Sequence, residues 1–457
     1  MINVTPYFQR STSAAPLAVF RVILGGMLLL SIVRFWMNGW IESVYILPKH
    51  HFSFYGFEFI KPLGTYTYAV FAICGLAAFM VTLGIFYRAA IITLFLSFTY
   101  IELIDKSTYL NHYYFISMIC LMMIFLPANA YFSLDARRDP HISGNTVPRW
   151  TIDVIRGFVT IVYVYAGLAK INSDWLVHAQ PLRIWLPSRN DMFIIGPLFS
   201  KVWIAYAFSW IGCLYDLSIP FLLSYRLTRI PAFCAVVIFH LLTAWLFPIG
   251  MFPYIMIGTS FIFFPSSFHE RVIQSVRSIA ARGIAGFRAI DPAVVQPYRM
   301  SSIGKYAALV FFSLFFLVQV ALPWRYLAYP DELFWTEEGY RFSWRVMLME
   351  KAGQAEFIVR DVNGYYENVN NDDFLTPLQE KMMAAQPDML IQYAHILKAH
   401  YKRKGFVSPQ VYVDSYVTLN GRIGRPMIDP TTDLVQLEDN LEHKYWILPF
   451  NDEIKGL

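Results

Sequence analysis

Long runs of apolar residues alternate with short polar stretches over the N-terminal part of the chain. A transmembrane helix needs about 20 mostly apolar residues, and fewer where neighbouring helices bury it. About nine runs approach this length. They cover residues 16–37, 65–86, 89–103, 112–126, 150–170, 201–224, 230–247, 251–264 and 305–322. The pattern predicts an all-α membrane bundle of about nine transmembrane helices, of which the third, fourth and eighth are short.

Arginines are concentrated in every second connection between these runs. Arg10 precedes the first run, and further arginines follow the second, fourth, sixth and eighth runs. Because positive residues favour the cytoplasmic side of a membrane, the N-terminus is expected in the cytoplasm and, after nine crossings, the C-terminal part outside it. The Arg- and Ala-rich segment 266–301 predicts an amphipathic helix on the anionic inner leaflet.

The sequence after residue 323 has a different pattern of polar and apolar residues, which indicates a second domain. Alternating residues around Asn363-Gly364 predict a β-hairpin with a two-residue turn, and the strand before Asn420-Gly421 predicts another. Between them, residues 376–404 have helical spacing that is interrupted at Pro387. We therefore expect a polytopic helical domain over 1–323 and an extracytoplasmic α+β domain over 324–457.

Composition agrees with a membrane protein. Hydrophobic residues make up 56% of the chain and charged residues 15%, whereas soluble proteins contain about 25% charged residues. All four cysteines fall within apolar runs, and no zinc-ligand spacing occurs, so we expect neither a disulfide framework nor a metal site. No basic run interleaved with aromatic residues suggests nucleic-acid binding. The N-terminal residues do not resemble a cleavable signal peptide, so the first helix is expected to stay in the membrane.

Lys170 ends a long apolar run just before polar residues begin. A lysine at the end of a membrane helix can extend its ammonium group to the interface, or it can complement the negative end of the helix dipole. A lysine held in apolar surroundings can also lose its proton and act as a base. The residues alone leave these three explanations open.

Other polar residues reach the same outer face under this topology. Asn111 and His112 begin the fourth run, and His240 lies two turns before the break at residues 248–250. His112 can also cap its helix, and His240 can also form a hydrogen bond between helices. Asp216, inside the sixth run, is expected to find a partner on a neighbouring helix. We predict a site at the membrane surface that opens outward.

Five stretches of the sequence, in this order, resemble a known family. They read Thr-Tyr-Leu-Asn-His-Tyr-Tyr-Phe from residue 108, Val-Tyr-Ala-Gly-Leu-Ala-Lys-Ile-Asn-Ser-Asp-Trp from 164, Phe-His-Leu-Leu-Thr-Ala-Trp-Leu-Phe-Pro-Ile-Gly-Met-Phe-Pro-Tyr from 239, Trp-Thr-Glu-Glu-Gly-Tyr-Arg-Phe-Ser-Trp-Arg-Val-Met-Leu from 335, and Ile-Asp-Pro from 428. Over nearly the whole chain they resemble the vitamin K-dependent gamma-glutamyl carboxylase family. The lack of cysteines in the loops is similar to a compact bacterial member, which implies an integral protein of a bacterial inner membrane.

The resemblance implies two coupled reactions in one active site. Reduced vitamin K, as phylloquinol or menaquinol, is oxygenated by O2 to its epoxide, and this reaction generates a strong base. That base removes a γ-proton from a glutamate of a peptide or protein substrate, and CO2 adds to the carbanion. A γ-proton beside a carboxylate is far too weakly acidic for a side chain of near-neutral pKa, so the cofactor has to generate the base.

The resemblance also implies roles for residues of the cofactor site. Lys170 corresponds to the base that deprotonates the hydroquinone, and His112 corresponds to an essential histidine that can donate a hydrogen bond to an oxyanion. Asn111 is expected to orient a ring oxygen of the naphthoquinone, and His240 is expected to bind in the same cofactor site.

Trp344, Arg345 and Met347 correspond to the family's glutamate-binding region, although the sequence departs from the family pattern there in detail. Arg345 can hold a carboxylate through two parallel hydrogen bonds. Because of this departure, two other functions stay open. One is a naphthoquinone epoxidase that does not carboxylate, and the other is a non-enzymatic protein that binds or transports quinones.

Overall fold

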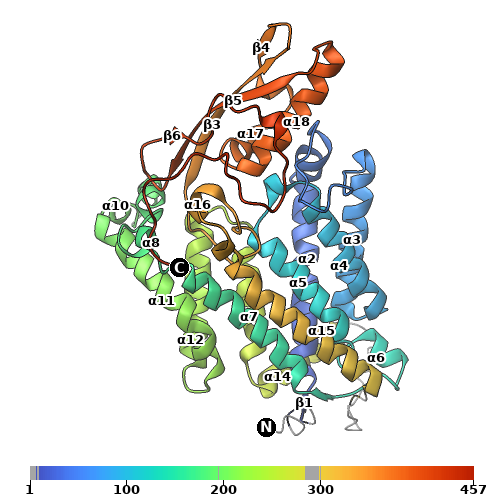
Figure 1. The fold of residues 1–457 in the computed structure, drawn as a ribbon. Coiled ribbons are helices and arrows are strands. Elements are labelled where there is room, and N and C mark those ends of the chain that lie inside the picture. Colours follow the sequence, from blue (N-terminus) through green and yellow to red (C-terminus); the bar gives the residue numbers. More distant parts are fainter. Residues whose placement is uncertain (1–6, 8–9, 194, 284–297, 299) are drawn as a thin grey trace.

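The computed structural model describes residue 7 and residues 10–193, 195–283, 298 and 300–457. A long helical bundle forms most of the molecule, and a smaller region of sheet and helices covers one of its ends (Figure 1). The N-terminus lies at the other end, where the short strands β1 (Ser11–Ser13) and β2 (Thr146–Pro148) pair antiparallel.

Each apolar run of the sequence forms a helix of the bundle. These helices are α2 (Ala15–Met37), α3 (Thr67–Leu83), α4 (Tyr87–Leu103), α5 (Asn111–Phe125), α7 (Trp150–Leu168), α11 (Val202–Ser224), α12 (Arg229–Leu246), α13 (Phe252–Ser260) and α15 (Ser302–Ala321). Within the described part of the chain, six helical segments are long and apolar enough to cross a membrane, and they begin at residues 15, 64, 150, 202, 229 and 302. The prediction of a helical membrane bundle is confirmed, but nine crossings are not.

The other three bundle helices are short. α4, α5 and α13 contain 17, 15 and 9 residues. At about 1.5 Å per residue, α5 and α13 extend only about 22 Å and about 14 Å, well below the hydrocarbon core of about 30 Å. α4 packs between α3 and α5, and α13 packs against α2 and α12. Neighbouring helices thus cover these short helices, and an apolar run alone does not distinguish a buried helix from a spanning one.

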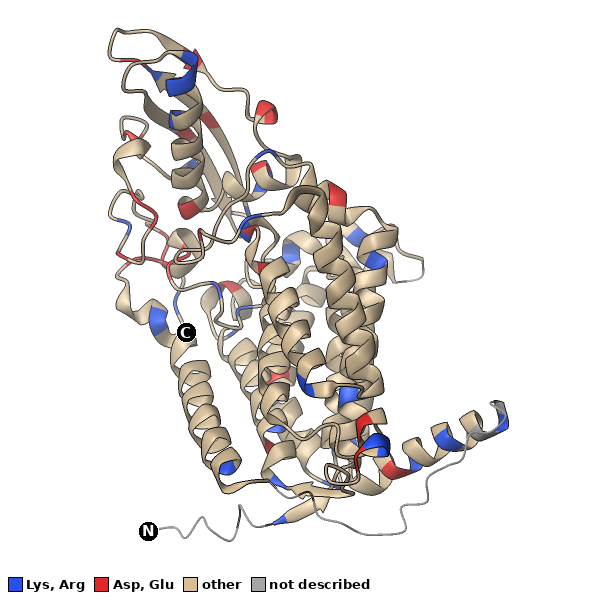
Figure 2. Ribbon diagram, turned by 90° about the vertical axis from the view of Figure 1, so that its right-hand side faces the viewer, with Lys and Arg blue, Asp and Glu red and all other residues tan. Residues whose placement is uncertain are grey.

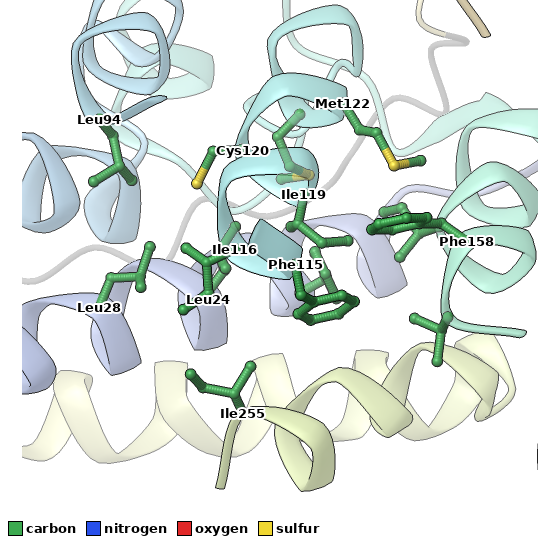
Figure 3. Packing of buried hydrophobic residues seen from close by; sticks show 14 of the residues in the cluster. Leu24, Leu28, Leu94, Phe115, Ile116, Ile119, Cys120, Met122, Phe158 and Ile255 are labelled. Carbon is green, nitrogen blue, oxygen red and sulfur yellow. The ribbon is translucent and has the colours of Figure 1, made fainter. Parts of the chain in front are cut away.

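The core of the bundle is built around α5. Figure 3 shows Phe115, Ile116 and Ile119 of α5 among side chains from α2, α4, α7 and α13. All three are at most 2% exposed. Phe115 stacks on Phe158 of α7, with ring centroids 5.5 Å apart and planes inclined by 12°. Because α5 is packed on several sides, its position is fixed by contacts with most of the bundle.

Charged residues gather toward the two ends of the bundle and in the sheet region, while its middle is mostly uncharged (Figure 2). The amphipathic helix predicted over 266–301 is present as α14 (Ser266–Gly283), which extends beyond the bundle and carries basic residues along its length. Residues 284–297 and 299 of that segment lie outside the described residues.

The C-terminal region contains an antiparallel sheet in the order β4-β3-β5-β6. β3 (Lys351–Arg360) and β5 (Gln410–Leu419) pair along their whole length, whereas β4 (Tyr366–Asn368) and β6 (Arg425–Pro426) are short edge strands. In the sequence, α17 (Pro377–Met383) and α18 (Pro387–Lys404) come between the two long strands. The predicted strands, and the helix interrupted at Pro387, are confirmed.

One predicted turn is wrong in detail. The amide of Gly364 donates to the carbonyl of Asp361, the amide of Asp361 donates to the carbonyl of Tyr365, and Gly364 has a φ of +89°. This is a three-residue loop with glycine at the bulge position, not a two-residue turn at Asn363-Gly364. At the second site, Asn420 and Gly421 both have positive φ, as a two-residue turn requires.

A buried charge cluster attaches the C-terminal region to the bundle. Lys106, after α4, is 2% exposed, and its ammonium lies 2.7 Å from Asp388 of α18 and 3.1 Å from Asp439. Arg341 also lies 2.7 Å from Asp388. Burial alone would raise the pKa of the Asp388 carboxyl, but the charges of Arg341 and Lys106 outweigh burial and hold this pKa well below its usual range.

Close packing of α2 on α3 depends on Gly25, and we expect Gly25→Ala to destabilise the protein. A Cβ at residue 25 would lie 2.5 Å from Thr82 Oγ1 and 2.8 Å from the carbonyl oxygen of Ala78. Overpacking of this kind costs about 1–3 kcal/mol. Gly26→Ala is the matched control because nothing lies within 4 Å of the added methyl group. The measurement is thermal unfolding in detergent, and equal melting temperatures for the two variants would contradict the prediction.

The cluster around Asp388 predicts a loss of stability in acid. The pKa of the Asp388 carboxyl is depressed in the folded state. The stabilisation that this carboxylate contributes is therefore complete above its unfolded-state pKa of about 3.9, and it is lost as the pH falls further. We therefore expect the free energy of unfolding to decrease from about pH 5 to pH 3. In Asp388→Asn, which cannot ionise at this position, the decrease should be smaller, and an unchanged decrease would argue against the assignment.

Candidate functional site

The turn after α7 determines the position of Lys170. The amide of Lys170 donates to the carbonyl of Gly167 at 3.0 Å. Two residues later, Asn172 caps the short helix α8 (Ser173–Leu176), because its side chain accepts a hydrogen bond from the amide of Trp175 at 2.9 Å. Lys170 is therefore held between a long helix and a capped turn, and it is only 6% exposed.

The ammonium of Lys170 forms an ion pair inside the bundle. Its Nζ lies 2.8 Å from Asp216 Oδ2 of α11 and donates to the carbonyl of Ala166 at 3.1 Å. It also lies 5.3 Å from the centre of the Trp175 ring, where the ring face attracts a cation. An ammonium has three N–H donors, and the protein groups described here accept two of them. The third can reach a ligand.

Lys170 and Asp216 line a cavity between α7, α11, α12 and α13. The cavity has a volume of about 800 Å3, including its open mouth. Its wall is mainly aromatic and aliphatic, with contributions from Val162, Trp175, Leu182, Trp185, Phe208, Phe239, Phe247, Phe252 and Met256. Polar groups are few, so the cavity suits an apolar ring system with a small number of polar substituents.

His240 also lines this cavity. It lies on α12, is 3% exposed, and its Nε2 is 3.0 Å from the hydroxyl of Tyr163. Tyr163 comes from α7, two helical turns before Lys170, and lines the same cavity. The Tyr163 hydroxyl thus orients the His240 ring between two helices.

His112 does not line the cavity wall. It lies in the first turn of α5, is 9% exposed, and its ring stacks on Phe252 with centroids 5.3 Å apart. Phe252 is itself a wall residue, and its ring centre is 6.1 Å from that of His240. Phe252 therefore lies in contact with both His112 and His240, the two histidines that the sequence predicts for the site.

Asn111 joins the bundle to the C-terminal region. Its amide group donates to the carbonyl of Arg345 at 2.8 Å, and its carbonyl accepts from the hydroxyl of Tyr109 at 2.9 Å. The hydroxyl of Tyr109 in turn accepts from the amide of Phe342 at 2.7 Å. Asn111 thus holds the segment that contains Arg345.

The predicted glutamate-binding residues separate into three environments. Trp344 is 1% exposed and packs against Tyr114 and Phe158 in the bundle core. Met347 lines the cavity. Arg345 is 4% exposed and lines a neighbouring crevice, with its guanidinium 4.6 Å from the Tyr326 ring centre. Burial lowers the pKa of Arg345 below its ordinary value.

Comparison with known protein families covers both parts of the molecule. Residues 9–268, more than half of the chain, match the HTTM domain family. Residues 304–453 match the family described as "Vitamin K-dependent gamma-carboxylase, lumenal domain". The chain belongs to the vitamin K-dependent gamma-carboxylase family. No solved structure matches it. Together with the apolar helices, membership makes this a membrane protein with a lumenal domain, from a family of vitamin K-dependent carboxylases.

The cavity fits the cofactor that membership in the gamma-carboxylase family implies. Reduced vitamin K has an apolar fused-ring system with two hydroxyl groups. The aromatic wall matches the rings, and Tyr163, Lys170, Asp216, His240 and Thr243 are polar residues of the wall. The donor set is therefore chemically suited to a hydroquinone.

Three residues near Lys170 were missed or only partly predicted from the sequence. A partner on a neighbouring helix was predicted for Asp216, but that partner was not identified as Lys170. Tyr163 and Trp175 were not predicted at all. A signal for Asp216 exists, because it is the single charged residue of α11, and a carboxylate inside a membrane helix needs a partner. Tyr163 and Trp175 carry no such signal, since aromatic residues are common throughout the chain.

The Lys170–Asp216 pair predicts strong coupling in a double-mutant cycle. Lys170→Met or Asp216→Leu leaves one buried charge without its partner, which costs about 3–5 kcal/mol. The double variant should be much closer to the wild type, because an apolar pair can replace a buried ion pair at little net cost. The measurement is the free energy of unfolding in a denaturing-detergent titration. Additive effects of the two substitutions would exclude a direct pair.

Proposed function

We propose that the protein is an integral-membrane gamma-carboxylase that couples the oxygenation of reduced vitamin K to the carboxylation of peptide glutamate. The observation that carries this proposal is the buried Lys170–Asp216 pair in the wall of an aromatic cavity in a chain of this family. When bound, the hydroquinone, together with O2, supplies the strong base that abstracts the γ-proton. CO2 and a glutamate-containing peptide or protein are the other reactants.

Lys170 and Asp216 act together as the base that starts the reaction. Lys170 gives one proton to Asp216 over 2.8 Å, and its neutral amine then takes a proton from the ligand hydroxyl. The pair changes its net charge from zero to plus one, which favours the negative charge left on the ligand. Asp216 is the positioning residue in this scheme, because it reaches the ligand proton only through Lys170.

The remaining predicted residues bind or orient. His240, held by Tyr163, donates or accepts a hydrogen bond at the cavity wall. His112 acts from behind Phe252 and reaches the ligand when that ring moves aside. Asn111 holds the carbonyl of Arg345 with one N–H of its side-chain amide and orients a ring oxygen of the naphthoquinone with the other. Trp344 anchors the segment that presents Arg345 and Met347 to the substrate carboxylate.

We place the protein in a bacterial inner membrane, with the N-terminus in the cytoplasm and the region 324–457 outside. Arginines of the sequence support this orientation through the positive-inside rule. The sheet region lies at the end of the bundle opposite the N-terminus, as this orientation requires (Figure 1). Membrane lipid then surrounds the domain 1–323.

A turnover assay tests the proposal. Purified protein in detergent is supplied with phylloquinol or menaquinol, O2, labelled bicarbonate and a glutamyl peptide, and the epoxide and the labelled γ-carboxyglutamate are quantified. Both products are expected in a stoichiometry near one. If epoxide forms without carboxylation, the protein is a naphthoquinone epoxidase. If neither product forms, it is a non-enzymatic protein that binds or transports quinones.

Lys170→Ala should abolish most of the epoxidation. Loss of a positioned base lowers a rate by about 10²–10⁴-fold, and carboxylation should fall in parallel because it depends on the same first step. Lys404→Ala is the control, because Lys404 forms an exposed pair with Glu367 and neither residue lines the cavity. Wild-type epoxidation in Lys170→Ala would refute the assignment of the base.

A further inference from the structure

The C-terminal segment pairs with the chain immediately after Lys170. The amide of Ser173 donates to the carbonyl of Lys455 at 2.7 Å, and the amide of Leu457 donates to the carbonyl of Ile171 at 2.9 Å. Asn172 and Gly456 form an antiparallel bridge. Residues 455–457 therefore add a short strand to the edge formed by residues 171–173, which we call the 171–173 edge.

Backbone groups hold most of this added strand. Lys455, Gly456 and Leu457 are exposed, and Ile454 is the buried side chain of the segment. The amide of Lys455 donates to the hydroxyl of Ser173 at 3.0 Å. A strand held in this way can be exchanged for another, because the edge recognises main-chain groups rather than a particular sequence.

The same segment ends at Arg345. Leu457 and Arg345 line one crevice, together with Leu168 and Ala169 of the chain that leads to Lys170. Arg345 Nη1 donates to the carbonyl oxygen of Leu457 at 3.4 Å, a long contact. Arg345 Nε is buried and has no hydrogen-bond partner among the described residues. The Nε–H therefore stays available for an acceptor, and a carboxylate is the best match for a guanidinium.

The 171–173 edge lies between the groups that a glutamyl peptide has to reach. It begins one residue after Lys170, which lines the cavity, and its added strand leads to Arg345. Successive residues of a strand point to opposite sides. A peptide bound there keeps its backbone on the edge while its side chains project to the two sides of the strand, one of which leads to the crevice of Arg345 and Leu457.

We propose that the 171–173 edge is the docking site for the backbone of the glutamyl substrate, and that residues 454–457 of this chain occupy it in the resting protein. The proposal rests on the proposed function, because it takes a glutamate-containing peptide as the substrate. The substrate binds by adding a strand in place of the C-terminal segment, with one of its carboxylates on Arg345.

Gly456 provides a variant that weakens the resting contact without shortening the chain. Its φ of +140° favours glycine, and a Cβ there would lie 2.3 Å from the carbonyl oxygen of Ile171 and 2.5 Å from the Cα of Asn172. Both are backbone atoms, so Gly456→Ala cannot keep this pairing. Gly424→Ala is the matched control in the same region, because its added methyl group meets ordinary contacts at 3.6 Å or more.

The experiment measures the binding of a fluorescein-labelled glutamyl peptide by anisotropy, in detergent and without hydroquinone. We expect Gly456→Ala to bind the peptide about tenfold more tightly than the wild type. A tenfold difference corresponds to a wild-type protein in which the C-terminal segment leaves the 171–173 edge free in about one molecule in ten. Gly424→Ala should bind like the wild type. In the turnover assay, KM for the peptide should fall in Gly456→Ala while KM for the hydroquinone stays unchanged.

A second measurement does not depend on the folding of a variant. A synthetic peptide with the sequence of residues 450–457 should displace the labelled glutamyl peptide from the wild-type protein. Unchanged affinity in folded Gly456→Ala, or no displacement by this peptide, would overturn the docking site. If the docking site is overturned in this way but the wild type still produces epoxide and γ-carboxyglutamate in the turnover assay, the proposed function stands while this inference falls.

Discussion

The arrangement of the site depends on the insertion of residues 340–349 of the C-terminal region into the helical bundle. Trp344, 1% exposed, packs against Tyr114, Phe115 and Phe158. Phe342, Trp344 and Met347 all have positive φ, and each such conformation costs about 1–3 kcal/mol in a residue other than glycine. Aromatic burial offsets this strain, so the backbone is held in a shape that brings Val346 and Met347 to the cavity wall.

Buried charges impose a second constraint. Lys106 and Lys170 are 2% and 6% exposed, and each is paired with an aspartate from a distant element. A buried charge without a partner is expensive, so each pair fixes the relative position of two parts of the molecule. The pair at Asp388 joins the bundle to the C-terminal region, whereas the pair at Asp216 lies in the cavity wall. The same kind of buried ion pair therefore joins two regions in one place and lines the cavity in the other.

Apolar runs and turn residues predicted the helices, the long strands β3 and β5, and the break at Pro387, because these features depend on local sequence. Apolar runs do not determine which of the short helices α4, α5 and α13 cross the membrane, since contact with neighbouring helices also favours apolar residues. The cavity contains Lys170, His240 and Met347, three residues to which the sequence pointed. The ion pair between Lys170 and Asp216, and the position of Arg345 in a neighbouring crevice rather than in the cavity, depend on how distant segments pack. Local sequence does not encode that packing.

Insertion of residues 340–349 also bears on how the molecule is made. During synthesis, Lys170 and Asp216 leave the ribosome long before Trp344 does. Until then the cavity lacks Val346 and Met347, which follow α15 in the chain and complete the wall. The complete cavity wall is therefore acquired late in biogenesis, and a C-terminal region released by itself would expose the otherwise buried Trp344 to water.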